Sequence, residues 1–172
     1  MIPTREEAKK LLAEAETHNP GAWARHSEVV AFCAERIAQA CPDLDAEKAY
    51  VIGLLHDIGR RFGVKHFGHI YDGYRYMNEL GYDEVARICA SHSFSIQRIE
   101  DYLAELVYDD YDKLIQLCDA IGAAEGVVSM EERMGDVKRR YGAYPQDKWD
   151  RNLWLKDYFS NKAGKDIYSL FI

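Results

Sequence analysis

Apolar residues recur along most of the chain at spacings of three and four residues, which is the period of amphipathic helices. No segment alternates apolar and polar residues in the way that a half-buried strand does. The pattern predicts helices at about residues 4–17, 23–40, 46–58, 70–80, 83–91, 99–106, 113–123, 129–141 and 147–159. We therefore expect an all-α protein, with an apolar end at residues 166–172 that packs back onto the helices.

Capping residues mark several of the expected helix boundaries. Two capping boxes, each a Thr or Ser followed three residues later by Glu, begin helices at Thr4 and Ser129. Gly59 is expected to end the third helix, and a short basic loop should follow it. The chain has no internal repeat and no linker. We expect one domain over residues 1–172, a multi-helix bundle with a C-terminal helical extension at 142–172.

The composition narrows the classes of partner. Of the 172 residues, 48% are hydrophobic and 30% are charged, as in an ordinary soluble folded protein. The formal charge is 22 − 29 = −7, so the chain lacks the positive field with which proteins bind nucleic acid polymers. No nucleic acid polymer is therefore expected as a partner. An anionic ligand would need local basic residues or a metal ion to attract it.

Three features of the sequence predict a cytoplasmic protein with no membrane partner. The cysteines form no C-x-x-C pair, and buried free thiols are typical of a reducing compartment. No run approaches the roughly 20 apolar residues that a membrane span needs. The segment from Met1 to Glu7 lacks the basic and apolar regions of a signal peptide.

Two acidic positions violate the apolar pattern. His56 and Asp57 end a helix that is apolar on nearly every side, and Asp119 lies inside a second apolar helix. A buried carboxylate costs several kcal/mol unless it is paired or bound to a metal ion. Some positive group is therefore expected to compensate both aspartates.

Histidines are the other residues that depart from the pattern. His26 begins the apolar stripe of the second helix, and His66, His69 and His92 lie further along the chain. Neutral imidazoles and carboxylates together are typical ligands of Fe, Mn, Zn or Mg, and the absence of cysteine pairs disfavours a structural zinc site. A divalent metal site is one interpretation, and hydrogen-bonded core histidines are the other.

The order and setting of these residues resemble a known family. His26, His56-Asp57 in "GLLHDIGR" and Asp119 in "IQLCDAIG" match the H…HD…D signature of HD-domain metal-dependent phosphohydrolases. The resemblance covers about residues 20–141. It implies an all-helical HD domain in which these four residues bind one divalent ion, of which Fe, Mn, Zn, Mg, Ni and Co are candidates.

A subset of that family binds two ions by means of two further histidines. Here His69, with Gly73 four residues later, and His92 in "ICASHSF" match those positions. The full pattern is similar to bacterial diadenosine tetraphosphate hydrolases of this superfamily, and it implies that Asp57 bridges the two ions. His66 is the rival of His69 for the first extra position, so the ligand set and the number of ions stay open.

The resemblance also implies a reaction. The implied enzyme is a phosphohydrolase that acts on a nucleotide or another small phosphoester by attack of metal-activated hydroxide. Asp57 and Arg60 are the expected catalytic residues, and Arg60 and Lys65 the expected substrate-binding residues, because basic side chains bind phosphate oxygens. Arg61 is expected to be solvated. The chain has neither a G-x-S-x-G motif nor a phosphate-binding G-x-x-x-x-G-K-[ST] loop.

Two alternatives stay open at this point. Some HD-type proteins with the same ligand pattern are di-iron oxygenases, and others are non-catalytic nucleotide-binding modules. The sequence does not name the substrate, and it leaves the oligomeric state open.

Overall fold

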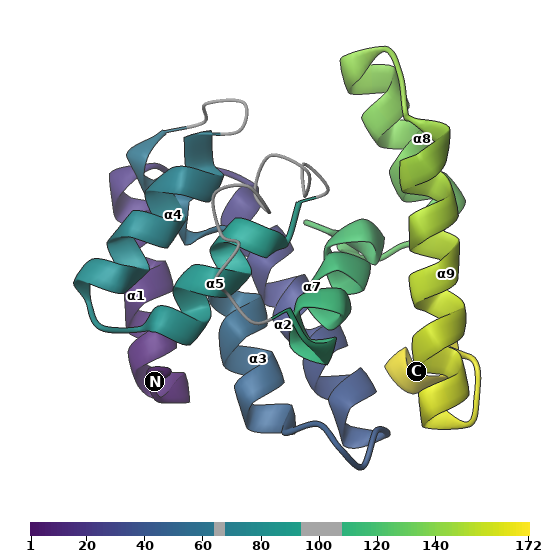
Figure 1. Ribbon diagram of the computed structural model, residues 1–172. Helices are drawn as coiled ribbons and strands as arrows, with labels where there is room; N and C mark the ends of the chain where they lie inside the picture. Colours follow the sequence, from purple (N-terminus) through teal and green to yellow (C-terminus); the bar gives the residue numbers. More distant parts are fainter. Residues whose placement is uncertain (64–67, 94–107) are drawn as a thin grey trace.

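The helices expected from the apolar periodicity are present wherever the computed structural model describes the chain, at residues 1–63, 68–93 and 108–172, and the protein is all-α (Figure 1). The helix expected at 99–106 lies outside the described residues. The elements are α1 (Arg5–His18), α2 (Trp23–Gln39), α3 (Ala46–Leu55), η1 (Ile58–Phe62), α4 (Gly68–Glu79), α5 (Asp83–Ser91), α7 (Asp110–Ile121), β1 (Gly122–Ala123), β2 (Gly126–Val127), α8 (Met130–Tyr141), α9 (Gln146–Ala163) and η2 (Ile167–Phe171).

Capping side chains set where several helices begin. The hydroxyl of Thr4 accepts a hydrogen bond from the backbone N–H of Glu7 at 3.2 Å, and the Glu7 carboxylate accepts one from the N–H of Thr4 at 2.8 Å. Asp109 and Asp112 form the same reciprocal pair at the start of α7. This acidic capping box explains why α7 begins at Asp110, whereas the apolar pattern predicted a start near residue 113.

Helix α3 lies at the centre of the molecule against α2 (Figure 1). Every residue from Val51 to Leu55 is buried, as expected for a helix that is apolar on nearly every side. A Cβ added at Gly53 would lie 3.0 Å from the Cα of Ala31, so the glycine lets the two helix backbones approach closely. This contact fixes α3, which His56 and Asp57 directly follow, against the helix that carries His26.

The predicted end of the third helix is wrong. The α-helix stops at Leu55, and a 3₁₀-helix, η1, replaces both its expected last turn and the first part of the expected basic loop. Gly59 is not a helix cap but lies inside η1. A Cβ added there would lie 2.0 Å from the carbonyl oxygen of His69 and 2.5 Å from the amide nitrogen of Gly73. Gly59 is therefore required because the backbones of η1 and α4 touch at this point.

A two-stranded antiparallel pair, which the sequence pattern did not predict, follows α7. Gly122 pairs with Val127 and Ala123 with Gly126, so each strand has two residues. Strands this short cannot display a period of two in the sequence. Gly126, the first residue of β2 after the turn, has a φ of +143°, a backbone conformation that favours glycine.

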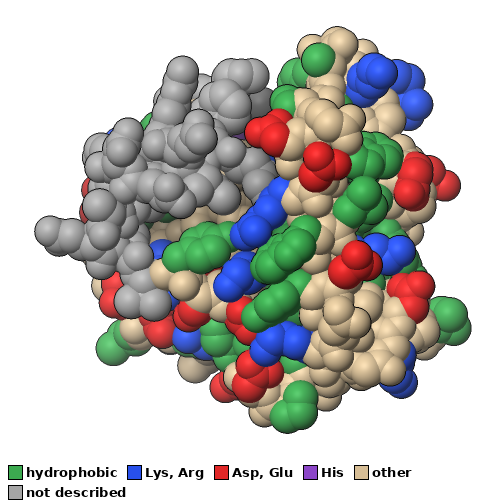
Figure 2. Space-filling model, turned by 45° about the vertical axis from the view of Figure 1, so that its right-hand side comes forward, with side chains coloured by type: hydrophobic (Ala, Val, Ile, Leu, Met, Phe, Trp, Pro, Cys, Tyr) green, Lys and Arg blue, Asp and Glu red, His purple; other side chains and the backbone are tan. Residues whose placement is uncertain are grey.

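The C-terminal helices α8 and α9 pack against α7, and η2 returns to α2, as expected for an apolar end (Figure 1). Only Asn152, Leu155 and Phe159 of α9 are buried. Figure 2 shows hydrophobic and basic side chains next to one another on one face of the molecule. On α9, the exposed Trp154 stacks on the half-buried Tyr158 at 5.0 Å, Arg151 lies 4.6 Å from the Trp154 ring and Lys162 lies 5.6 Å from the Tyr158 ring. None of the helices in the described ranges has both the length and the apolar composition that crossing a bilayer requires.

The close contact at Gly59 leads to a prediction. Gly59→Ala should lower the free energy of unfolding by about 3 kcal/mol, because its methyl group would displace α4 from η1. Gly135→Ala in α8 is the matched control, since the nearest atom to its added Cβ is Nη1 of Arg139 at 3.7 Å. That control should raise the free energy of unfolding by about 0.5–1 kcal/mol. Urea unfolding of both variants measures the difference, and equal effects would contradict the contact.

Candidate metal centre

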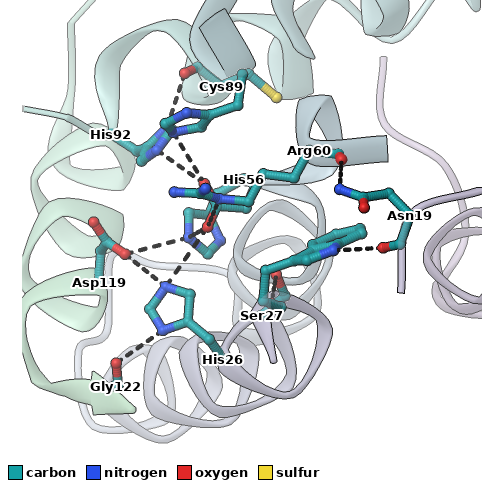
Figure 3. Close-up of polar contacts among 12 residues, drawn as sticks. Asn19, His26, Ser27, His56, Arg60, Cys89, His92, Asp119 and Gly122 are labelled. Atoms are coloured by element: carbon teal, nitrogen blue, oxygen red, sulfur yellow. Dashed lines mark hydrogen bonds and ion pairs between the residues drawn. The ribbon is translucent and has the colours of Figure 1, made fainter. Parts of the chain in front are cut away.

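Six side chains from five parts of the chain meet in the interior of the molecule, and Figure 3 labels four of them, His26, His56, His92 and Asp119. They are those singled out as metal ligands in the sequence: His26 of α2, His56 and Asp57 after α3, His69 of α4, His92 after α5 and Asp119 of α7. His56 is fully buried, and Asp57, His69 and His92 are at most 6% exposed. The side chain of Asp119 is 29% exposed, so the cluster is closest to solvent on the α7 side.

Asp57 lies between two groups of histidines. Its Oδ2 atom is 3.6 Å from Nε2 of His56 and 3.8 Å from Nε2 of His26. Its Oδ1 atom is 3.2 Å from Nε2 of His92 and 3.4 Å from Nε2 of His69. The two oxygens of one carboxylate therefore face two different sets of imidazole nitrogens.

Asp119 completes the first of these sets. Its Oδ1 atom lies 2.7 Å from Nε2 of His26 and 3.4 Å from Nε2 of His56 (Figure 3). We call His26, His56, Asp57 and Asp119 the first group, and Asp57, His69 and His92 the second group. In the trio of His26, His56 and Asp57, and in the second group, the possible ligand atoms all lie within 4.8 Å of one another.

The histidine rings are held so that their Nε2 atoms point to the centre. Nδ1 of His26 contacts the carbonyl oxygen of Gly122 at 2.8 Å, that of His56 contacts Gly53 at 2.7 Å, and that of His92 contacts Cys89 at 2.8 Å. Because a carbonyl only accepts, each of these Nδ1 atoms carries a proton, and the Nε2 atom of a neutral ring can then offer its lone pair to a metal ion. This is the arrangement of histidines that ligate metal ions.

The same local geometry holds His56 and His92. Each follows the end of a helix, and each ring reaches the carbonyl oxygen three residues earlier, in the last helical turn. Those carbonyls lack helical partners, so a histidine at this position satisfies one of them. His92 therefore contacts the end of its own helix and the centre at the same time.

The carboxylates are ionised although they lie in the interior. Burial alone would raise the pKa of Asp57, but the neighbouring His56 and His92 and the charge of Arg60 hold it well below its ordinary value. Burial would likewise raise the pKa of Asp119, but its hydrogen bond with His26 and its proximity to His56 hold it well below its ordinary value. Both acids therefore require positive charge around them.

The donor set fits a divalent metal ion. Burial lowers the pKa of His69 to about 4, so this ring is neutral at pH 7 and offers a lone pair. Within the described part of the chain, Nε2 of His56 and Oδ1 of Asp57 are buried without a hydrogen-bond partner. Imidazole nitrogens and carboxylate oxygens that converge in this way suit Fe, Mn, Zn and related ions. The cluster could therefore hold a divalent metal.

A comparison with protein families agrees with this geometry, since the profile of the HD domain matches residues 23–124, more than half of the chain. The chain belongs to the HD-domain family. All six residues of the centre lie inside the matched segment. Comparisons with curated proteins and with solved structures gave no match. The similarity to diadenosine tetraphosphate hydrolases, the bounds of the single domain and the roles of the six residues as ligands stay predictions.

Arg60 borders the centre of the HD domain. Its Nε atom lies 3.1 Å from Oδ2 of Asp57, and its carbonyl oxygen accepts a hydrogen bond from Nδ2 of Asn19 at 2.6 Å (Figure 3). The expectation that Arg61 is solvated is wrong, because its side chain is 12% exposed and pairs with Glu14 at 3.1 Å. Lys65, together with His66 as the rival of His69, lies outside the described residues.

A basic residue that the sequence pattern did not indicate interacts electrostatically with Asp119. Lys148 of α9 lies beyond the matched segment, and its Nζ atom is 5.7 Å from the centre of the Tyr144 ring. Burial lowers the pKa of Lys148, whereas the charge of Asp119 acts to raise it. Lys148 therefore lies near the exposed side of the centre. No motif marked it, since a lysine on a polar helix resembles any solvated one.

The depressed pKa of His69 predicts a pH dependence for the metal-free protein. Between pH 7 and pH 5 the unfolded chain takes up a proton at this ring, because its ordinary pKa is 6.5, but the folded chain, with a pKa of about 4, does not. The free energy of unfolding should therefore fall by about 2 kcal/mol over this range through His69 alone.

Urea unfolding in the presence of EDTA at the two pH values measures this loss. His69→Gln should show a smaller loss than the parent, and His18→Gln, which changes an exposed ring that pairs with Glu14, should match the parent. An unchanged loss in His69→Gln would show that another group causes the pH dependence.

Proposed function

We propose that this HD-domain protein is a metal-dependent phosphohydrolase that acts on a nucleotide or another small phosphoester. The observation that carries the proposal is the position of Asp57, whose two oxygens face two separate sets of imidazole nitrogens. A carboxylate in this position suits two ions that share one ligand. The first group would hold one ion, and the second group would hold the other. When bound, divalent ions supply Lewis acidity, which activates water and offsets charge on phosphoryl oxygens.

The side chains around the centre have separate tasks in this proposal. The carbonyls of Gly122, Gly53 and Cys89 fix three of the imidazoles before any ligand arrives, so little reorganisation is needed. Arg60 holds its guanidinium group beside Asp57 and offers N–H groups to a phosphoryl oxygen. Its side chain is 24% exposed, so a substrate that enters on the side of Asp119 would meet both residues.

Positive charge near the exposed side supports an anionic substrate. Lys148 and Arg133 come from the C-terminal helices: Lys148 lies over the Tyr144 ring, and the charge of Arg133 acts on both Lys148 and Tyr144. The chain as a whole has a formal charge of −7, so these cations provide the local attraction that a phosphate needs.

The decisive experiment is to purify the protein without a metal-binding tag, measure its metal content and screen nucleotides and phosphoesters for phosphate release. Activity that EDTA abolishes, that added Mn²⁺ restores and that Asp57→Asn lacks would support the proposal. Oxygen uptake with bound iron and no phosphate release would instead indicate a di-iron oxygenase, the alternative with the same ligand chemistry. Binding of nucleotides without turnover would indicate a non-catalytic module.

The second group leads to a prediction about rate. His92→Ala should lower kcat at least about a hundredfold, equivalent to about 3 kcal/mol of transition-state stabilisation, because one ion would lose a ligand. If His92 only satisfies the end of its helix, turnover should stay nearly intact and stability should fall by about 1 kcal/mol. Steady-state kinetics together with thermal unfolding separates these outcomes, and His18→Ala is the control for loss of an exposed histidine.

The charge of Lys148 leads to a prediction about substrate affinity. Lys148→Met should raise KM about fivefold to tenfold and leave kcat within about twofold, because it would remove attraction that acts equally on bound substrate and transition state. Lys156→Met is the matched control, since Lys156 lies on the same helix with its Nζ atom 5.3 Å from the Tyr168 ring. An unchanged KM in Lys148→Met would exclude Lys148 from substrate binding.

A further inference from the structure

A second polar cluster, buried at Ser91, Asp112 and Gln116, lies between α5 and α7, next to the candidate metal centre but without any of its six residues. Its members are Arg87, Ser91, Tyr108, Asp109, Asp112 and Gln116. Asp112 and Gln116 are fully buried. Polar groups are retained in the interior only when hydrogen bonds satisfy them, so the geometry of such a cluster is tightly specified.

Gln116 uses both ends of its amide group. Its Nε2 atom donates to the carbonyl oxygen of Ser91 at 2.8 Å, and its Oε1 atom accepts from the hydroxyl of Tyr108 at 3.0 Å. Ser91 is the last residue of α5 and directly precedes His92. Gln116 lies three residues before Asp119, slightly less than one turn of α7. A single side chain therefore connects the backbone beside His92 to the helix that carries Asp119.

Asp112 holds Ser91 at a second point. Its Oδ1 atom accepts a hydrogen bond from the Ser91 hydroxyl at 2.5 Å, and its Oδ2 atom accepts one from the backbone N–H of Asp109 at 2.8 Å. Arg87 of α5 lies 3.3 Å from the same Oδ2 atom. The end of α5 is therefore attached to α7 through both the hydroxyl and the carbonyl of Ser91.

These two attachments act on different parts of Ser91. The hydroxyl contact involves a side chain that rotates about its own bond, whereas the carbonyl belongs to the peptide unit that continues into His92. Because that peptide unit is rigid, the bond from Gln116 constrains the backbone from which the His92 ring projects. The ring is then oriented by Cys89, and the possible ligand atoms of His56, His92 and Asp119 lie within 4.8 Å of one another.

We propose that Gln116 is a positioning residue. Its hydrogen bond to the carbonyl of Ser91 fixes the backbone at His92, and this sets the distance between the second group and Asp119. The inference rests on the two metal-binding groups of the proposed function. Loss of this hydrogen bond should lower the affinity of the second group for its ion more than the affinity of the first group. Partners that orient metal ligands typically contribute tenfold to a hundredfold in metal affinity.

The test measures Mn²⁺ binding to the metal-free protein by calorimetry, which requires no turnover. The parent should show two binding events, and His69→Ala identifies the event that belongs to the second group, because it removes a ligand of that group alone. Gln116→Met keeps the side-chain length without the amide. It should lower the Mn²⁺ affinity of the second group at least about tenfold and leave that of the first group within about twofold. If Gln116→Met does not fold, Gln116→Asn takes its place: its side chain is too short to reach Ser91, so the same loss of affinity is expected.

Two control variants separate positioning from stability. Asn152→Leu removes another fully buried amide, one on α9 that donates to the hydroxyl of Tyr144, and should leave the affinities of both ions unchanged. Ser91→Ala removes the hydroxyl contact to Asp112 but keeps the carbonyl contact to Gln116, so the second event should persist.

Equal weakening of both events in the Gln116 variants, weakening in Asn152→Leu to the same extent, or a parent that binds fewer than two ions would overturn the inference. If the binding results hold but no phosphoester is hydrolysed, the proposed reaction fails and the positioning role stands.

Discussion

A carboxylate enclosed by imidazoles is the feature on which the rest of this structure depends. Asp57 is 3% exposed, and both of its oxygens face nitrogen atoms of histidines. An ionised carboxylate in this position costs several kcal/mol unless positive charge surrounds it. In the folded chain the guanidinium group of Arg60 and the imidazoles around the two aspartates provide this compensation. A divalent ion on each side of Asp57 would supply it without protonating the rings.

The helical architecture is arranged around this requirement. Glycines let the backbones come close where the side chains of the centre must meet: Gly53 brings α3 against α2, and Gly59 brings η1 against α4. Helix ends supply carbonyls that orient the rings, as at His56 and His92. The centre is therefore built from helix termini and close backbone contacts, and flexible loops have little part in the described residues that form it.

Much of the site was predictable because it violates the hydrophobic pattern. Charged residues in apolar helices, such as Asp57 and Asp119, need compensation, and that requirement predicted a positive group or metal ion beside them. The family resemblance implied that they converge with His26 and His56. The family resemblance added His69 and His92, which the structure also brings to the centre. The end of α3 at Leu55 was not predictable, because the sequence continues to look apolar and helical where tertiary contact with α4 imposes a 3₁₀ turn. Lys148 and Gln116 gave no signal, since their roles depend on neighbours distant in sequence.

Anomalous diffraction from a crystal grown with Mn²⁺ would show directly whether an ion lies on each side of Asp57. Two anomalous peaks are expected, one enclosed by His26, His56, Asp57 and Asp119, the other in contact with Asp57, His69 and His92. A crystal with a single peak or none among these residues would show that Asp57 is not shared by two ions.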